Sequence, residues 1–357
     1  MSDRRVRLAV QLVGAAVAIA ILARIIGRAD AAATWKAVSS AGPWVPLALL
    51  PFALGMAADS WGTAALLRAL GHRVTLAQML PVRLAGEALH VTMPAGFVAA
   101  DGATAMLLQS RCGVPVRDGV VASVARKWLV MRSHAAYIVF GAIAGFGAIA
   151  TLSHERLGSG LLPWIVLVSS VVPLALSEGV RAGLLGRTTL ASVRSALARV
   201  PSRRLARWLE SQRQHVDATD AQIGRLRGAR GAIVTATLSF LACWCFEALE
   251  SALLLRLVGA RVELSSVFAV EAGLSLVRSA IVIAPSGFGV VDLGYATVFS
   301  ALGADAATAS AFVLLKRGKE AAWAAVGFAL LARLPSARLP SARPAHQSVS
   351  AIALPSQ

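Results

Sequence analysis

The feature that most constrains this chain is an apolar segment that is broken in the middle. Residues 83–108 read RLAGEALHVTMPAGFVAADGATAMLL, and Pro94 and Gly96 interrupt them. A helix that crosses a membrane needs roughly 20 consecutive, mostly apolar residues. We therefore predict a short helix, a break at residues 93–96 and a second short helix, rather than one spanning helix.

The same pattern returns 191 positions later in the chain. The matching positions are Pro94, Gly96, Phe97 and Asp101 in the first copy and Pro285, Gly287, Phe288 and Asp292 in the second. Two broken apolar segments in corresponding places are typical of transporters built from two internal repeats, with the binding site at the breaks. The sequence thus predicts a duplicated fold.

The composition indicates an all-α polytopic membrane protein. The chain has 357 residues, of which 57% are hydrophobic, and its mean hydropathy is +0.69. Its net charge of +17 comes largely from arginines in loops beside apolar runs. Such a distribution fits anchoring on the cytoplasmic side of a membrane, so we expect no nucleic-acid partner. The three cysteines show neither metal-binding nor disulfide spacing, and we expect no metal or cofactor.

Six apolar runs are predicted to span the membrane. They are residues 6–27, 43–67, 119–150, 161–185, 231–258 and 304–332, and the broken segments are residues 76–109 and 264–302. Arginine bias puts both termini and the loops at 68–73 and 187–230 in the cytoplasm. If each broken segment returns to its own side, the first enters from the cytoplasm and the second from the opposite face, which makes an inverted repeat. If each crosses twice, the count rises to eight helices.

This interpretation gives a single transmembrane domain over residues 1–332. Repeat 1 covers about residues 43–150 and repeat 2 about residues 231–332. A basic insertion at residues 187–230 has ten arginines against three acids. Its apolar residues recur at roughly helical spacing, which fits an amphipathic helix on an anionic leaflet or a solvated connector. Residues 333–357 are predicted to be a disordered tail.

Many charged residues lie inside the apolar segments. An ionised side chain at the bilayer centre costs about 2.5–3.5 kcal/mol, so these residues must face a polar interior and pair with one another. Spacings of three, four or seven residues put several of them on common helix faces. These sets are Arg83, Glu87 and His90; Glu271 and Arg278; and Lys316 and Glu320. One pair alone fits a structural ion pair, but the whole set favours a charged cavity.

The breaks add a second kind of candidate site, because the N-terminus of a half-helix has free N–H groups that favour anions. Asp101 and Asp292 are expected to cap these half-helices or to pair with Arg126 or Arg317. A count of eight basic against seven acidic residues within the membrane favours a phosphate-bearing headgroup. The candidate binding residues are Arg83, Glu87, His90, Asp101, Arg126, Arg278, Asp292, Lys316 and Arg317, and the candidate helix breaks are Pro94, Gly96, Pro285 and Gly287. The sequence has no catalytic motif, and we do not expect an enzyme.

The pieces around these residues resemble a known family. Gly86-Glu87, residues 94–101, residues 285–292 and Lys316-Arg317 are similar to the flippase-like family related to the transmembrane region of lysylphosphatidylglycerol synthase, which includes a hopanoid-associated branch. The family often has Gly-Gly before the first acidic residue, where this chain has Ala99-Ala100. The resemblance implies an inner-membrane protein that moves or binds lipids, without the aminoacyl transferase domain of the full synthase.

The leading hypothesis is a lipid flippase or lipid-transport protein of the bacterial inner membrane. An anionic headgroup would bind in a charged cavity between the two inverted repeats. One alternative is an ion-coupled transporter of a small solute. Another is a non-transporting subunit that docks a lipid-modifying enzyme through residues 187–230. The sequence does not give the lipid, the direction of movement or the oligomeric state.

Overall fold

The computed structural model describes residues 31–92, 96–185, 222–226, 228–280, 287 and 289–333. Every regular element in these residues is a helix, as predicted. The predicted span at residues 6–27, most of the basic insertion and the tail after residue 333 lie outside the described residues.

Two series of helices make up the described chain. The first contains α2 (Ala31–Ser40), η1 (Gly42–Ala48), α3 (Leu49–Ala69), α4 (Leu76–Thr92), α5 (Gly96–Cys112) and α6 (Val116–Ala144), followed by α7 (Phe146–Leu157), α8 (Leu162–Ser169) and α9 (Val171–Leu185). The second contains α13 (Arg230–Leu257), α14 (Leu264–Ala280), α15 (Val290–Ala301) and α16 (Ala306–Arg333). The predicted breaks fall between α4 and α5 and between α14 and α15.

Three described helices are long and apolar enough to cross a membrane, and a bent pair raises the number to four. The three are Gly42–Ala69, Leu162–Ala182 and Arg230–Leu257, and each matches a predicted span. The predicted span at 119–150 is not straight, because α6 ends before Gly145 and α7 turns away by 71°. α16 forms as expected, but charges near its middle set it apart from a plain apolar span.

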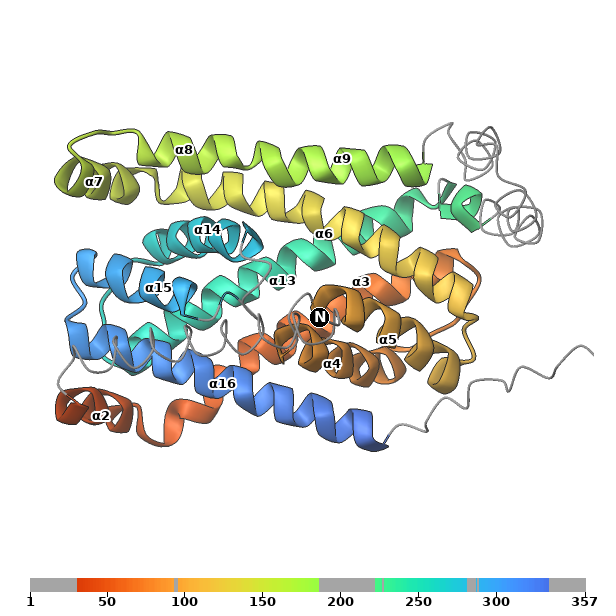
Figure 1. The fold of residues 1–357 in the computed structure, drawn as a ribbon, viewed down its shortest axis with the longest axis horizontal. Coiled ribbons are helices and arrows are strands. Elements are labelled where there is room, and N and C mark those ends of the chain that lie inside the picture. The colour runs from red at the N-terminus through yellow and green to blue at the C-terminus, as the bar shows by residue number, and fades with distance from the viewer. Residues whose placement is uncertain are drawn as a thin grey trace, which may run out of the picture.

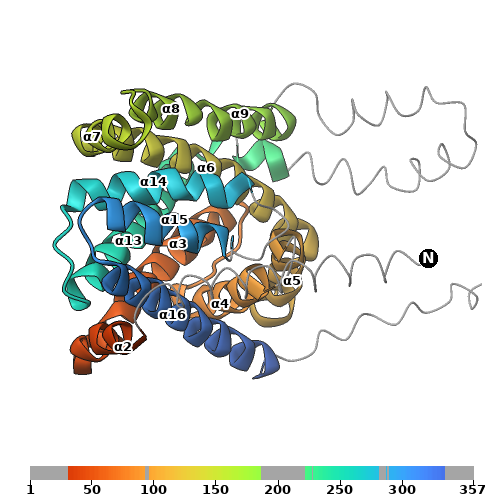
Figure 2. The same cartoon turned by 60° about the vertical axis from the view of Figure 1, so that its left-hand side comes forward.

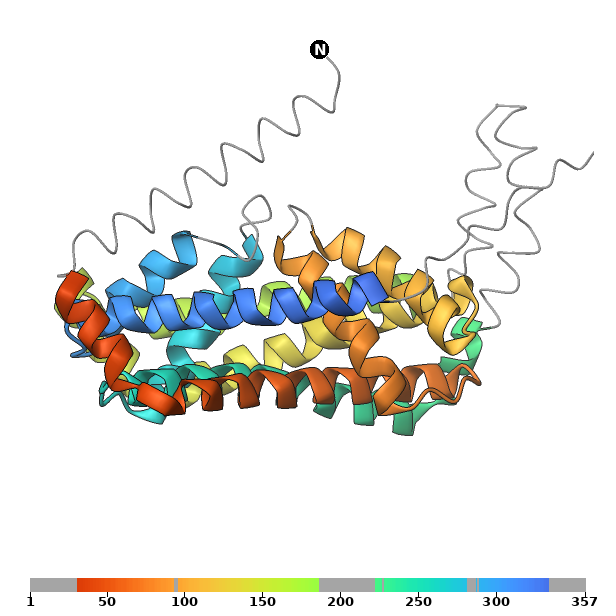
Figure 3. The same ribbon diagram turned by 90° about the horizontal axis from the view of Figure 1, so that it is seen from below.

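The helices α3 to α6 correspond in order to α13 to α16. The lengths agree for α4 and α14, with 17 residues each, and nearly so for α6 and α16, with 29 and 28. α3 and α13 lie against each other along the long axis of the molecule and run in opposite directions (Figure 1). α4 and α5 occupy one end of the molecule, and α14 and α15 occupy the other (Figure 3). α8 and α9 cover one side of α6 (Figure 2).

The two series interlock, since α4 packs on α16 and α14 packs on α6. Glycines permit these close contacts. A Cβ at Gly327 of α16 would clash with the carbonyl oxygen of Leu84 on α4. A Cβ at Gly141 of α6 would lie 2.8 Å from the carbonyl oxygen of Phe268 on α14. The second helix of each four-helix repeat, α4 or α14, is therefore held by the fourth helix of the other repeat, α16 or α6.

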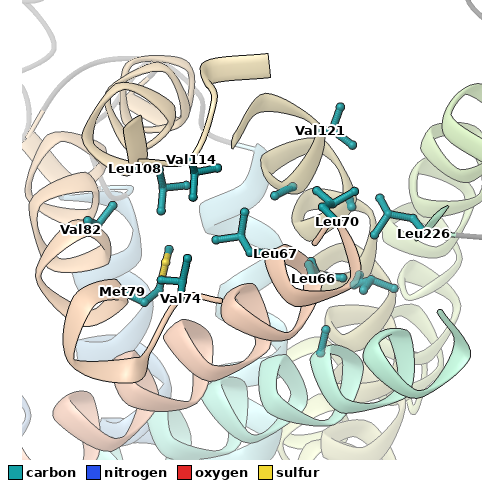
Figure 4. Close-up of a cluster of buried hydrophobic side chains, with 14 of the residues drawn as sticks. Leu66, Leu67, Leu70, Val74, Met79, Val82, Leu108, Val114, Val121 and Leu226 are labelled. Carbon is teal, nitrogen blue, oxygen red and sulfur yellow. The ribbon is translucent and has the colours of Figure 1, made fainter. Parts of the chain in front are cut away.

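A buried apolar cluster joins α3, α4, α5 and α6 at the end of the molecule nearest the basic insertion (Figure 4). Leu66 and Leu67 of α3, and Leu70 directly after it, meet Met79 of α4 in this cluster. Leu226, near the end of the insertion, is also buried in it, and so is Ile223. This part of the insertion therefore packs against protein, whereas the sequence favoured a lipid surface or solvent for the whole segment.

Candidate functional site

Two arginines converge on one buried acid in the first series. Asp59 of α3 accepts hydrogen bonds from Arg83 of α4 and from Arg126 of α6. The shortest nitrogen–oxygen distance is 2.7 Å in each pair. Arg126 also lies over the ring of Phe240, 5.7 Å from its centroid. We call Asp59, Arg83 and Arg126 the Asp59 cluster.

The charged residues beside the Asp59 cluster are partly accessible. Lys127 of α6 pairs with Asp101 of α5 at 2.5 Å, and their side chains are 29% and 25% exposed. Glu87 and His90 lie on the same face of α4 with 3.5 Å between their nearest nitrogen and oxygen. The expected pair of Asp101 with Arg126 is therefore replaced by Asp101 with Lys127, because Arg126 turns to Asp59 instead.

The second series has a more closed set of charges, which we call the Glu271 cluster: Glu250, Ser251, Glu271, Tyr295, Lys316 and Lys319. Lys316 Nζ lies 2.9 Å from Glu271 Oε1 and 2.7 Å from Ser251 Oγ. Lys319 Nζ lies 2.9 Å from Glu250. The side chains of Lys316 and Glu271 are only 5% and 2% exposed. The four charges of this cluster are buried and neutralise one another.

Arg278 links the Glu271 cluster to Glu247, which lies outside the cluster. Its guanidinium pairs with Glu247 of α13 and donates to the Tyr295 hydroxyl at 3.1 Å. That hydroxyl donates to Glu271 Oε2 at 2.7 Å. The sequence placed Glu271 and Arg278 on one helix face, but Tyr295 bridges them and the direct partner of Arg278 is Glu247.

Asp292 performs two tasks at the start of α15. It accepts a hydrogen bond from the backbone N–H of Gly289 at 2.8 Å, which caps the helix. Its other carboxylate oxygen lies 2.8 Å from Arg317 Nε, as expected from the sequence. Arg317 also pairs with Glu320 at 2.5 Å, so Glu320 is a partner of Arg317 and not of Lys316.

Gly287 precedes this helix with a φ of +64°, a conformation that side-chain-bearing residues rarely adopt. A Cβ there would lie 2.5 Å from Val291 Cγ2. α15 begins at Val290, so Asp292 lies in its first turn rather than one and a half turns along. α5 begins at Gly96, whereas Pro94 and Pro285 lie outside the described residues.

Three residues that complete these clusters were not among the predicted site residues. Asp59 is the central acid of the first series, and Ser251 and Tyr295 bind charged groups in the second. A lone aspartate inside an apolar span was the available signal for Asp59. With Asp59 included, acids and bases balance at eight each, and Arg132 is exposed to the outside of the bundle. The predicted positive excess is therefore wrong for the site as a whole.

A small pocket lies between α4 and α16. Glu87 and Glu320 both line it, together with Trp323. The buried indole N–H of Trp323 has no hydrogen-bond partner within the described part of the chain. In those same residues, no three His, Cys, Asp or Glu side chains are placed to hold a metal ion. The arrangement can thus bind charged or polar groups by ion pairing and hydrogen bonding.

Long apolar helices around paired, partly accessible charges define a multi-pass helical membrane protein with a polar interior. The chain belongs to the family described as the lysylphosphatidylglycerol synthase TM region, whose match covers residues 11–329. This confirms the resemblance drawn from the sequence, and no aminoacyl transferase domain is found. No curated protein and no solved structure matches the chain.

Proposed function

We propose that the protein binds the phosphate of an anionic lipid headgroup in its polar interior and moves the lipid across the bacterial inner membrane. The observation that carries the proposal is the convergence of Arg83 and Arg126 on the single carboxylate of Asp59. Two guanidinium groups share one carboxylate there, so an incoming anion can compete with Asp59 for one of them.

Arg126 is the arginine in this cluster that is best placed to meet a ligand. Its side chain is 20% exposed, whereas that of Arg83 is 5% exposed. Arginine binds phosphate with the same forked geometry that it uses for a carboxylate. A headgroup phosphate can therefore replace Asp59 at Arg126 while Arg83 still neutralises Asp59.

Arg317 plays the corresponding part in the second series of this proposal. It lies 191 positions after Arg126 and is shared between Asp292 and Glu320. If a phosphate takes the place of one of these acids at Arg317, the arginine stays paired throughout. This matters because an unpaired charge in a low-dielectric interior is costly. The lipid tails would remain in the bilayer during this exchange.

The proposal includes a topology. α3 to α6 and α13 to α16 form an inverted repeat in which α4–α5 and α14–α15 are re-entrant hairpins from opposite faces, and six helices span. Opposite directions of α3 and α13 and the opposite ends occupied by the hairpins support it. The arginine-rich end, with both termini, is cytoplasmic.

Impermeant thiol reagents test this topology in intact cells. Single cysteines are placed at the exposed positions Glu155 and Arg73 of a cysteine-free protein. Glu155→Cys should be labelled from outside, and Arg73→Cys should be labelled only after the cells are opened. Labelling of Arg73→Cys in intact cells would reverse the orientation.

Reconstituted vesicles test the lipid function. Vesicles carry fluorescent phosphatidylglycerol, and dithionite reports how fast the lipid leaves the protected leaflet. Arg126→Gln should slow movement at least tenfold, with yield and gel-filtration profile close to wild type. Arg132→Gln, six residues along the same helix and exposed, is the matched control and should keep the wild-type rate. Equal rates in Arg126→Gln and wild type would remove Arg126 from the mechanism. Absence of lipid movement by the wild type would favour a solute transporter or a docking subunit.

A further inference from the structure

A cavity separate from the charged interior lies beside α7. α7 is found at one end of the molecule (Figure 1). We propose that this cavity holds an acyl chain of an anionic phospholipid, with the lipid phosphate at Arg156. The inference rests on the proposed function, because it takes a membrane lipid as the ligand.

The cavity lies between four helices and has a volume of about 520 Å³, within the range of roughly 300–1,000 Å³ typical of ligand sites. Its lining is mostly aliphatic, with three hydroxyl groups and one charge. The lining residues are Leu152, Arg156 and Leu157 of α7, Leu162 of α8, Leu293, Ala296, Thr297, Val298, Ser300 and Ala301 of α15, and Ala306, Ala309 and Ser310 of α16.

The bend between α6 and α7 forms this cavity. α6 meets α14 so closely at Gly145 that a Cβ there would lie 2.9 Å from the carbonyl oxygen of Ser265. The chain then turns by 71°, and α7 carries Leu152 and Leu157 across to α15. The close contact at Gly145 and the angle between α6 and α7 therefore determine where this cavity forms.

The edge of the cavity suits a lipid better than a water-soluble ligand. Leu157 and Leu293 line it and are 63% and 47% exposed, so the cavity opens through an apolar rim. A rim of exposed leucines is stable where hydrocarbon chains cover it. A dissolved solute would leave these side chains in water.

Arg156 gives the site its charge preference. It is the single charged side chain among the described residues that line the cavity, and it lies in the last turn of α7. An arginine beside an apolar cavity matches a lipid whose phosphate stays at the membrane surface while its chain enters the protein. The hydroxyls of Thr297 and Ser300 can donate to the ester carbonyl oxygens next to that phosphate.

The site communicates with the charged interior through α15. Leu293 and Thr297 face the cavity, while Asp292 and Tyr295 of the same helix bind Arg317 and Glu271. A lipid in the cavity therefore contacts the helix that carries part of the candidate transport site. We infer that the cavity is where a lipid leaves or joins the outer leaflet.

Photo-crosslinking of the full chain in vesicles tests the site. The probe is a phosphatidylglycerol with a diazirine at the end of one acyl chain, and labelled peptides are mapped by mass spectrometry. Ala301→Trp and, as a second filling variant, Ser300→Trp should lower labelling of α7 and α15 at least fivefold. Val168→Trp, on an exposed face of α8 outside the cavity, should leave labelling unchanged.

Arg156→Gln tests the charge. It should lower labelling by the phosphatidylglycerol probe at least threefold and leave labelling by a diacylglycerol probe, which has no phosphate, unchanged. The control is Arg261→Gln, in the loop between α13 and α14. Equal loss with both probes would overturn the role of Arg156.

Undiminished labelling in both filled variants would overturn the site. So would crosslinks from a cysteine at Thr297 to residues 1–30, or to a second copy of the chain, since protein would then occupy the cavity. Labelling needs no transport, so a site that labels as expected while vesicles show no lipid movement contradicts the proposed function alone. Intact movement with no labelling contradicts this site alone.

Discussion

The two series of helices use the same plan but reverse the charge on their second helix. In both four-helix repeats, an acid on the first helix (α3 or α13) pairs with a cation on the fourth (α6 or α16). These pairs are Asp59 with Arg126, and Glu250 with Lys319. The second helix of the first series brings a cation, Arg83, whereas that of the second series brings an acid, Glu271.

This reversal gives the two clusters different properties. The Asp59 cluster has two cations around one acid and a partly exposed Arg126, which is why we propose it as the anion-binding cluster. The Glu271 cluster has two lysines for two glutamates, all buried, and Ser251 and Tyr295 take up further hydrogen-bonding capacity. The Asp59 cluster is thus suited to binding and the Glu271 cluster to holding helices together, while Arg317 of the second copy lies outside the Glu271 cluster.

We expect the largest loss of stability when Lys316 is replaced. Lys316→Met leaves Glu271 as a buried charge without its cation. Breaking such a buried pair costs about 3–5 kcal/mol. The melting temperature and folded yield of the purified protein should both fall sharply. The matched change Lys127→Met in the first series should cost about 1 kcal/mol or less, because that pair is partly exposed. Equal losses would erase the contrast between the clusters.

The double variant Lys316→Met/Glu271→Gln sharpens this result. It removes both members of the pair, so it should recover much of the stability lost in Lys316→Met. Failure to recover, together with lost lipid movement, would assign Lys316 a direct role in transport.

The contacts that hold the two series together come next. Gly327→Ala and Gly141→Ala push a methyl group into the facing helix, and overpacking of this kind costs about 1–3 kcal/mol. The control is Gly318→Ala in α16, where nothing lies within 4 Å of the added Cβ and where alanine favours the helix. Thermal unfolding in detergent measures all three. A neutral Gly327→Ala would show that α4 and α16 are not tightly joined.

A smaller difference separates the two repeated aspartates. Asp292→Asn weakens both a helix cap and the contact with Arg317, and we expect a loss of about 1–2 kcal/mol. Asp101→Asn affects one partly exposed pair and should cost less than about 1 kcal/mol. Identical melting temperatures for the two variants would show that the aspartates are equivalent despite their different places in α5 and α15.

The smallest effect concerns the N-termini of α6 and α16, the fourth helices of the two repeats. Asp305 accepts hydrogen bonds from the Thr308 backbone N–H at 2.9 Å and its hydroxyl at 2.7 Å, whereas α6 has no side-chain cap at Pro115. Asp305→Ala should cost about 1 kcal/mol at neutral pH.

The pH dependence of that effect follows from the same bonds. The Thr308 N–H lowers the pKa of Asp305, so its carboxylate stabilises the fold above the unfolded pKa and loses this contribution as pH falls through the folded pKa. Wild type and Asp305→Ala should therefore converge in melting temperature below about pH 4, near the ordinary pKa of aspartate. A constant difference down to pH 3 would contradict a role for the charge.

Much of the helical layout could be predicted from the sequence. The start of α4 at Leu76 and of α14 at Leu264 agree with the predicted boundaries, because local hydropathy, proline and glycine decide where such helices begin and break. The bend at Gly145 could not be predicted. It depends on the approach of Ala269 and Ser265 from a distant part of the chain.

The ion pairs were harder to predict than the helices. Helical spacing identifies side chains on one face, but it does not say which other helix faces them. Arg83 therefore pairs with Asp59 on α3 rather than with Glu87 one turn away, and Lys316 pairs with Glu271 rather than Glu320. The rotation of each helix about its axis, fixed by packing such as that at Gly327, decides these partners.

The interlock of α4 with α16 also bears on how the chain is made. During synthesis, α4 with Arg83 enters the membrane long before α16 is made. Until Gly327 and its helix arrive, Leu84 and Ala88 lack their final neighbour. The first series must therefore wait in the bilayer in a provisional arrangement, with Asp59 as the early partner of Arg83. The packing of α4 is therefore complete only after α16 has been made and has closed onto it.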